Sequence, residues 1–199
     1  YKDVPAGVAW VMPDESSAMR QAVQRLVQAG HRKIAHLAGP AVFSASSLRY
    51  TAFITAMKEI GLQPYCHRID ATWNGQVSQA VAWRATNRQA EIRRALADLM
   101  QRGMTGVVCF NDGMAMALWK IAQEHGLQIP RDLSIIGVDD AAEAEEWRLT
   151  TFVNPFREIG RTAIESLLAL LQGGDVEAHC RTLPMKMIDR NSVGPPRLF

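Results

Sequence analysis

The sequence has no apolar run long enough to cross a bilayer, and its first residues lack the basic, apolar and small-residue order of a signal peptide. Cysteine is scarce: Cys66, Cys109 and Cys180 are odd in number and far apart, which indicates buried thiols in a reducing compartment and not a disulfide scaffold. Neither charge dominates, since 22 Lys and Arg, spread along the chain, stand against 20 Asp and Glu. That balance is poor evidence for nucleic-acid contact by this segment itself. We therefore expect a cytoplasmic protein that does not contact the membrane.

The chain also lacks an initiating Met, and its opening "YKDVPAGVAWVMPDESS" enters in the middle of a pattern. We therefore expect a preceding part to be missing. The 199 residues are 48% hydrophobic, which is enough to bury a core in one large lobe or two small ones. No low-complexity tract or internal repeat is visible, so the chain is expected to be globular.

Strand-like apolar runs alternate with helical patterns along the chain. The strand-like runs cover residues 33–40, 65–70, 105–110, 133–138 and 181–190. The helical patterns cover residues 14–30, 44–61, 76–102, 113–126 and 154–174. The third helix is expected to break near Asn87, and the last to begin with Asn154 as its cap and Pro155 in its first turn. This alternation predicts an α/β fold, in which a parallel sheet is sandwiched by helices.

Polar residues follow several of these strands. In open parallel sheets, ligands bind in the crevice beyond the carboxyl ends of the strands. The residues that directly follow a strand are Asn111, Asp112, Asp139 and Asp140, while the segment "SASSLR" and Trp73 follow two other strands less directly. We therefore expect polar side chains to gather on one rim of the sheet.

Each of these residues also has an ordinary structural explanation. Asp112 and Asp140 are expected to be helix caps or turn formers, as an acidic residue after a strand usually is. Arg49 would by default be a solvated residue or an ion-pair partner. Trp73 would by default be a half-buried anchor of its loop.

The set is more informative than its members because the side chains are chemically complementary to one class of ligand. A carboxylate accepts two hydroxyl protons, a guanidinium offers a planar fork of donors, and an amide does both jobs. An indole covers an apolar C–H face. Together these groups suit a polyol, so a sugar or a nucleoside is the natural candidate.

Five blocks of the sequence, in order, carry a resemblance to a known family. The blocks are "AGHRKIAHLAGP", "SSLRYTAFITAMKEIGL", "GVVCFNDGMAMALWKIAQEHGLQIPRDLSIIGVDD", "LTTFVNPFREIGRTAIESLLALLQGG" and "LPMKMIDRNSV". They resemble the effector-binding region of the LacI/GalR family of bacterial transcriptional repressors. That region has the fold of type I periplasmic sugar-binding proteins.

The resemblance implies a division of the chain into parts of two lobes. Residues 16–149 and the final strand at 182–193 would form the C-terminal lobe, and residues 150–174 would return to the N-terminal lobe. The helix-turn-helix head that binds operator DNA would be absent from this chain. The family also implies a homodimer, and we expect the helix with "MAMALW" to contribute to its interface, because its apolar residues exceed what one buried stripe requires.

The resemblance also assigns roles to residues. Arg49, Asn111 and Asp139 match family positions that contact a small-molecule effector. Trp73 falls where an aromatic ring often stacks on the effector, and Ser46 lies in a loop where the family often places a hydroxyl. Asp112 and Asp140 remain caps in this interpretation, and no cofactor and no metal site are expected.

Three functions follow from the sequence. The favoured one is an effector-sensing domain of a DNA-binding repressor, which binds a sugar-like or nucleoside-like molecule and couples it allosterically to operator binding. The alternative is a periplasmic solute-binding protein that serves a sugar transporter. An enzyme is disfavoured because the sequence has no glycine-rich phosphate loop, no nucleophile elbow and no His or Cys cluster at metal-ligand spacing.

Overall fold

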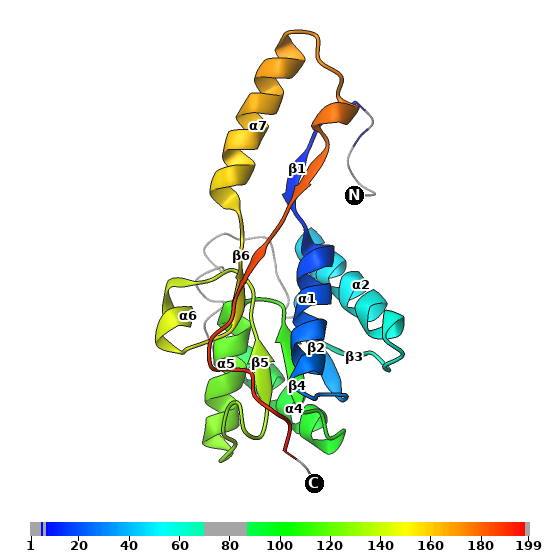
Figure 1. Ribbon diagram of the computed structural model, residues 1–199. Coiled ribbons are helices and arrows are strands. Elements are labelled where there is room, and N and C mark those ends of the chain that lie inside the picture. Colours follow the sequence, from blue (N-terminus) through cyan, green and yellow to red (C-terminus); the bar gives the residue numbers. More distant parts are fainter. Residues whose placement is uncertain (1–4, 6, 70–86, 198–199) are drawn as a thin grey trace.

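A four-stranded parallel sheet forms the centre of the molecule. The computed structural model describes Pro5, residues 7–69 and residues 87–197 of the chain. The strands are β2 (Ile34–Ala38), β3 (Tyr65–Arg68), β4 (Gly106–Cys109) and β5 (Ser134–Ile136). They stand in the order β3-β2-β4-β5, and each neighbouring pair is parallel (Figure 1). The predicted parallel sheet is confirmed.

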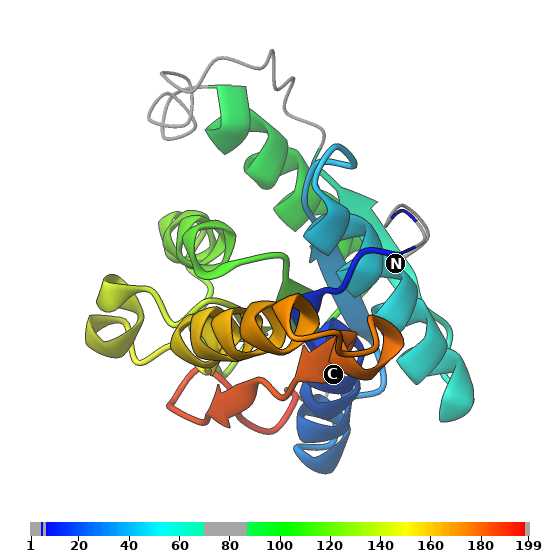
Figure 2. The ribbon, with the colours of Figure 1, turned by 90° about the horizontal axis from the view of Figure 1, so that it is seen from above.

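Alternate side chains of the strands face two separate apolar clusters. Leu37, Val107 and Ile135 pack with helices α4 (Asn87–Gln101) and α5 (Asp112–Glu124). Ile34, Val108 and Ile136 pack with helices α1 (Glu15–Gln28) and α2 (Ser44–Glu59). A two-residue period with both sets buried is the pattern of a sheet covered on both faces. Figure 2 shows the two pairs of helices on opposite sides of the strands, as predicted.

Several predicted boundaries hold and others need correction. Asp14 caps α1 by accepting a hydrogen bond from the Ser17 N–H at 2.9 Å. Of the helix predicted at 76–102, residues 87–101 form α4, and the part up to residue 86 lies outside the described residues. The strand predicted over 181–190 is two strands, β7 (Arg181–Leu183) and β8 (Lys186–Ile188). They are separated at Pro184, which has no N–H for a strand ladder.

The apolar residues of α5 are used within the chain's own core. Met114, Ala115, Leu118 and Trp119 are buried, and Met116 and Ala117 pack half-buried against the same cluster. Met116 and Ala117 stay partly exposed in the single chain, so a contribution of this helix to a dimer interface stays a prediction.

A smaller group of elements lies at one end of the molecule. There β1 (Val11–Pro13) pairs in parallel with β7, and α7 (Phe156–Leu171) lies beside them (Figure 1). The strand β6 (Thr151–Val153) leads into α7 and pairs antiparallel with β8. Short helices, α6 (Ala142–Glu146) and the 3-10 helix η1 (Glu177–His179), complete the connections. None of the helices among the described residues is long and apolar enough to cross a membrane.

Candidate functional site

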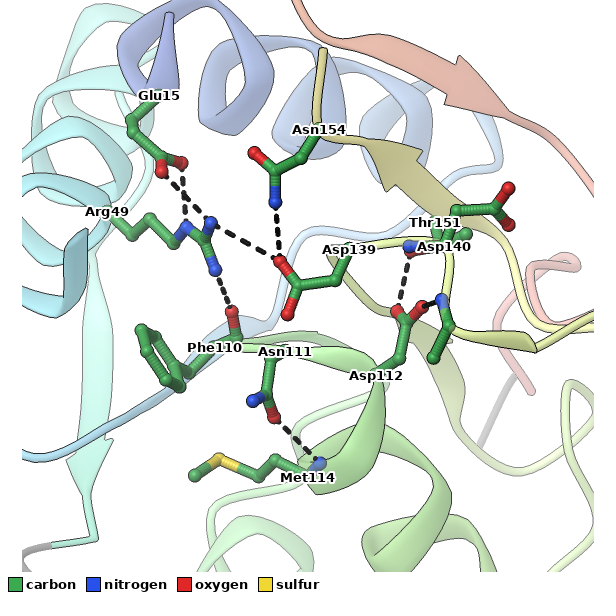
Figure 3. Close-up of polar contacts among 11 residues, drawn as sticks. Glu15, Arg49, Phe110, Asn111, Asp112, Met114, Asp139, Asp140, Thr151 and Asn154 are labelled. Atoms are coloured by element: carbon green, nitrogen blue, oxygen red, sulfur yellow. Dashed lines mark hydrogen bonds and ion pairs between the residues drawn. The ribbon is translucent and has the colours of Figure 1, made fainter. Parts of the chain in front are cut away.

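Three of the predicted site residues meet at the carboxyl-end rim, the edge of the central sheet where its parallel strands end. Arg49 comes from the second turn of α2, Asn111 follows β4, and Asp139 follows β5 (Figure 3). Residues far apart in the chain converge here because parallel strands end on the same side of a sheet. The predicted gathering of polar side chains is thus present.

Arg49 is buried and held by an ion pair. Its Nε and Nη2 donate to the two carboxylate oxygens of Glu15 at 2.7 and 2.9 Å, and its Nη1 donates to the Phe110 carbonyl at 2.5 Å. The side chain is 4% exposed, and a buried guanidinium requires such partners. The ion-pair explanation is therefore confirmed and the solvated one is wrong. The planar fork expected to face a ligand is occupied by Glu15.

Asp139 lies at the centre of the rim. Its φ is +116°, and its N–H donates to the Phe152 carbonyl at 2.8 Å. Its Oδ1 accepts a hydrogen bond from Asn154 at 2.7 Å and lies 3.7 Å from Arg49 Nη2. Partial burial raises the pKa of the Asp139 carboxyl to about 6; Arg49 opposes the rise, whereas Asp112 adds to it.

Asn154 is not a helix cap, contrary to the sequence-based expectation. Helix α7 begins at Phe156 with Pro155 at its cap position, and no side chain bonds the first turn. The Asn154 amide N–H instead donates to the Asp139 carboxylate at 2.7 Å, a charge-assisted hydrogen bond across the rim.

Asn111, and not Asp112, caps helix α5. Asn111 caps α5, since its Oδ1 accepts a hydrogen bond from the Met114 N–H at 2.9 Å. Asp112, expected to be a cap, is instead 1% exposed and accepts hydrogen bonds from Thr151 Oγ1 at 2.6 Å and from the Ala141 N–H at 2.8 Å. Burial raises the pKa of Asp112, and those two hydrogen bonds oppose the rise. Glycine is required at Gly137 because a Cβ there would clash with Asp112 Oδ1.

Asp140 is also not a cap. Helix α6 has Ala141 at its cap position without a side-chain hydrogen bond, and Asp140 instead forms an ion pair with Arg190 at 2.9 Å. Arg190 also donates to the Leu149 carbonyl, so the ion pair ties the loop after β5 to the end of the chain.

The two remaining candidates stand apart from this group. Ser46 is buried, and its Oγ donates to the Gly39 carbonyl at 2.7 Å and lies 3.5 Å from Arg68 Nη1. Its hydroxyl proton is therefore engaged within the protein. Trp73 lies outside the described residues.

Glu15 and Asn154 are the polar residues of the rim that sequence reasoning missed. Glu15 was concealed in "DESS", where it reads as part of a helix start, and Asn154 in a capping pattern. No sequence signal marks Glu15, because an acidic residue in the first turn of a helix is favourable whether or not it is buried. Its partner Arg49 lies 34 residues away and becomes evident only in the folded chain.

The arrangement offers hydrogen bonds and no reactive group. Asp139 keeps a carboxylate that is 39% exposed, Asn111 keeps an amide N–H₂ because its cap uses the oxygen, and Arg49 keeps N–H groups outside its contacts. Within the described ranges, no group of three or more His, Cys, Asp or Glu could hold a metal ion. The three cysteines are free thiols; Cys109 is buried as predicted, whereas Cys66 and Cys180 are only partly buried.

The chain is similar in sequence and in fold to known proteins. Residues 23–193 match the sequence model of the periplasmic binding protein-like domain. The HTH-type transcriptional repressor CytR of Escherichia coli (strain K12) is 32% identical over 185 residues, which are 90% of this chain and 50% of that protein. A regulatory protein of the LacI family from Chloroflexus aggregans has a crystal structure that superposes with a TM-score of 0.77 at 33% identity, covering 96% of this chain and 66% of that one.

A further solved structure shows such a fold with its partners. The crystal structure of the lac repressor dimer bound to operator and the anti-inducer ONPF superposes with a TM-score of 0.74 at 26% identity, covering 92% of this chain and 60% of that one. The chain spans about half the length of the curated relatives it matches, with 43%, 50% and 58% of their lengths covered.

Proposed function

Because the chain belongs to the periplasmic binding protein-like domain family, we propose that it is the effector-sensing part of a DNA-binding transcriptional repressor. The observation that carries the proposal is the meeting of Arg49, Asn111 and Asp139 on one rim of a fold whose relatives are HTH-type transcriptional repressors. The effector is a sugar-like or nucleoside-like molecule. Operator DNA binds to a head that this chain does not contain.

The chemistry of the rim supports a polyhydroxyl ligand. Asp139 accepts hydrogen bonds from hydroxyl groups, while the Asn111 amide and the N–H groups of Arg49 donate to ring or hydroxyl oxygens. Trp73 covers an apolar face of the ligand, and Ser46 orients Arg68 and the loop at Gly39 beside it. Burying several hydroxyls against matched partners gives specificity because an unmatched polar group would be costly.

Two connections at the rim couple the ligand to the rest of the molecule. Glu15 lies two residues after β1, and Asn154 directly follows β6, so each stands where the chain crosses between the central sheet and the elements around α7. The division proposed from the family resemblance puts residues 16–149 and 182–193 in one lobe and 150–174 in the other; Thr182 and Leu183, however, pair with β1 in the group around α7. An effector that binds the two lobe arrangements unequally shifts their balance, and operator affinity changes by linkage.

The whole regulator is proposed to be a cytoplasmic homodimer without catalytic activity. Its relatives are transcriptional repressors, which favours this role over transport of a solute. The lac repressor structure is a dimer on its operator, which supports the same assembly here.

A ligand screen of the longer protein that carries this chain tests the proposal. Sugars, sugar phosphates, nucleosides and purines are added one at a time, and a true effector raises the melting temperature because it binds only the folded state. The same compound must then change the affinity for operator DNA, measured by fluorescence anisotropy. Sedimentation at micromolar concentration tests the dimer. A protein that binds no compound, or whose DNA binding ignores the compound, is not this kind of regulator.

A further inference from the structure

The buried edge of Arg49 is already paired with a carboxylate of the same chain. The Nε and Nη2 of Arg49, the edge that matches a carboxylate or phosphate, bind both oxygens of Glu15. The two side chains are 4% and 5% exposed. The third nitrogen, Nη1, donates to the Phe110 carbonyl, and the guanidinium carbon lies 5.2 Å from the Phe110 ring centroid. Arg49 is therefore fixed in position and neutralised.

The remaining charges of the rim are unfavourable for an anion. Asp139 lies 3.7 Å from Arg49 Nη2 and presents a second carboxylate on the side away from Glu15 (Figure 3). Asp112 contributes further negative potential to Asp139. The nearby guanidinium of Arg190 is paired with Asp140. An anion at Arg49 would have to displace Glu15 from a buried bidentate pair or lie against Asp139.

We propose that Glu15 is a specificity-determining residue of the effector site, which neutralises Arg49 so that the site accepts neutral polyhydroxyl ligands and rejects phosphorylated or carboxylated ones. The inference rests on the proposed function, since it concerns the same site. In this inference, Glu15 acts by excluding anionic ligands. Arg49 still offers single N–H donors to hydroxyl oxygens, but its positive charge is neutralised by Glu15 within the protein.

Matched ligand pairs test the inference on the longer protein that carries this chain. Ribose with ribose 5-phosphate, and uridine with uridine 5′-monophosphate, are titrated by calorimetry into wild type and Glu15→Gln. We expect wild type to bind the neutral member of a pair at least about tenfold more tightly, and Glu15→Gln to reduce that ratio by about tenfold or more. If Glu15 has only a structural role, Glu15→Gln should weaken the binding of both members of a pair equally and leave the ratio of their affinities unchanged. That outcome, or tight binding of an anionic member to wild type, for instance at Arg68, overturns the inference.

Titration with inorganic phosphate tests the exclusion of anions by Glu15 even if no sugar or nucleoside binds. Phosphate should raise the melting temperature of Glu15→Gln more than that of wild type, because the Arg49 edge becomes available. Asp139→Asn is the comparison variant: it also removes one negative charge from the rim but leaves both Glu15 oxygens on Arg49, so its gain should be clearly smaller than that of Glu15→Gln. Equal phosphate effects in the three proteins overturn the inference. Glu15→Asp, whose side chain is one methylene shorter and so holds its carboxylate back from the Arg49 edge, replaces Glu15→Gln if the latter does not fold. Absence of every neutral ligand contradicts the proposed function and the acceptance of neutral ligands, while phosphate gained by the Glu15 variant would still show that Glu15 excludes anions from Arg49.

Discussion

Asp139 combines an unusual backbone with an available carboxylate. Its φ of +116° is rarely adopted by L residues, and Asn tolerates positive φ better than most. We therefore expect Asp139→Asn to fold normally. Once an effector is known, its affinity should fall about ten- to a hundredfold, because a charged hydrogen bond contributes roughly 1.5–3 kcal/mol. Calorimetric titration beside a melting curve measures both quantities.

Asp140→Asn is the natural control for that experiment. Its φ of +50° also suits Asn, and it loses the ion pair with Arg190, whose side chain is 15% exposed. The cost in unfolding free energy should be about 1 kcal/mol or less, and effector affinity should stay the same. Equal affinity of the Asp139 variant and wild type would leave that carboxylate without a role in binding.

The raised pKa of Asp139 predicts a pH dependence of ligand binding. Its pKa is about 6, chiefly because burial disfavours the charge; Arg49 and Asn154 oppose the shift, and Asp112 and Glu15 reinforce it. Affinity for a hydroxyl ligand should fall as pH drops below about 6, where the carboxylate protonates. Between about pH 4 and pH 6 the folded state binds more protons than the unfolded one, so this group favours folding more strongly as pH falls. A carboxyl NMR titration of wild type should show the midpoint, which Asp139→Asn lacks.

His36 has the opposite effect on acid stability. It is fully buried on β2, its Nδ1–H donates to the Val108 carbonyl at 2.8 Å, and its Nε2 has no hydrogen-bond partner among the described residues. Burial lowers its pKa from 6.5 to about 4, and Arg49 and Arg68 add to the effect. Stability should therefore be full above about pH 6.5 and should fall toward pH 4, by on the order of 3 kcal/mol in all.

The variant His36→Phe isolates this contribution. Phe cannot titrate, and a second ring still stacks near Phe53, whose centroid lies 5.4 Å from that of His36. Urea unfolding at pH 7 and pH 5 should show a larger loss for wild type than for the variant. Parallel losses in the two proteins would assign the acid sensitivity to other groups.

For the residues of the site, the sequence predicted their place in the fold but not their hydrogen-bond and ion-pair partners. Arg49, Asn111 and Asp139 could be placed on one rim because each follows a strand or begins a helix beside one. Asp112, Asp140 and Asn154 were misassigned because capping is the commonest use of such residues, while their true partners lie up to 50 residues away in the chain. Local pattern carries no information about those contacts.

At the scale of elements, prediction succeeded where a run was long and its flanks were marked. Strands β2 and β4 are fully buried runs, and the helices around them end at Gly30, Gly61 and Gly126, each with positive φ. Strand β1 is three residues long and pairs with β7 across the whole chain, so no local period reveals it, and β7 was predicted only as part of the longer run at 181–190. Such short strands form only because a segment distant in the sequence pairs with them.

Helix α7 gives a prediction about stability at this scale. Its apolar residues Ile164, Leu167, Leu168 and Leu171 are exposed, although its pattern predicts a buried stripe. In the 199-residue chain, Leu168→Gln should change the unfolding free energy by no more than about 0.5 kcal/mol. Phe53→Ala, at a fully buried position between α2 and the sheet, should cost about 3–5 kcal/mol. Urea denaturation of both variants provides the comparison, and a comparable loss in the two would mean that α7 is covered in solution.

At the scale of the whole molecule, the rim lies where the two groups of elements are joined. Glu15 reaches Arg49 from the first crossing of the chain, and Asn154 reaches Asp139 from the second. The direct contact between Arg49 and Asp139, at 3.7 Å, links the two crossings. A ligand that engages Asp139 therefore competes with a hydrogen bond from a connecting segment, which is a physical route from binding to rearrangement.

Asn154→Ala tests this route in the longer protein that carries the chain. The variant removes the amide that competes with the ligand for Asp139 Oδ1, so effector affinity should be unchanged or slightly higher. The effect of the effector on operator affinity should shrink by about fivefold or more, because a coupling of roughly 1–3 kcal/mol loses one of its contributing contacts. Asn191→Ala is the control, since Asn191 is exposed and contacts Arg148 at 3.5 Å, away from the rim. Calorimetry gives the effector affinity, and operator anisotropy with and without effector gives the coupling. Full coupling in Asn154→Ala would show that the second crossing transmits nothing through this hydrogen bond, and would leave Glu15 and Arg49 as the connection between ligand and lobes.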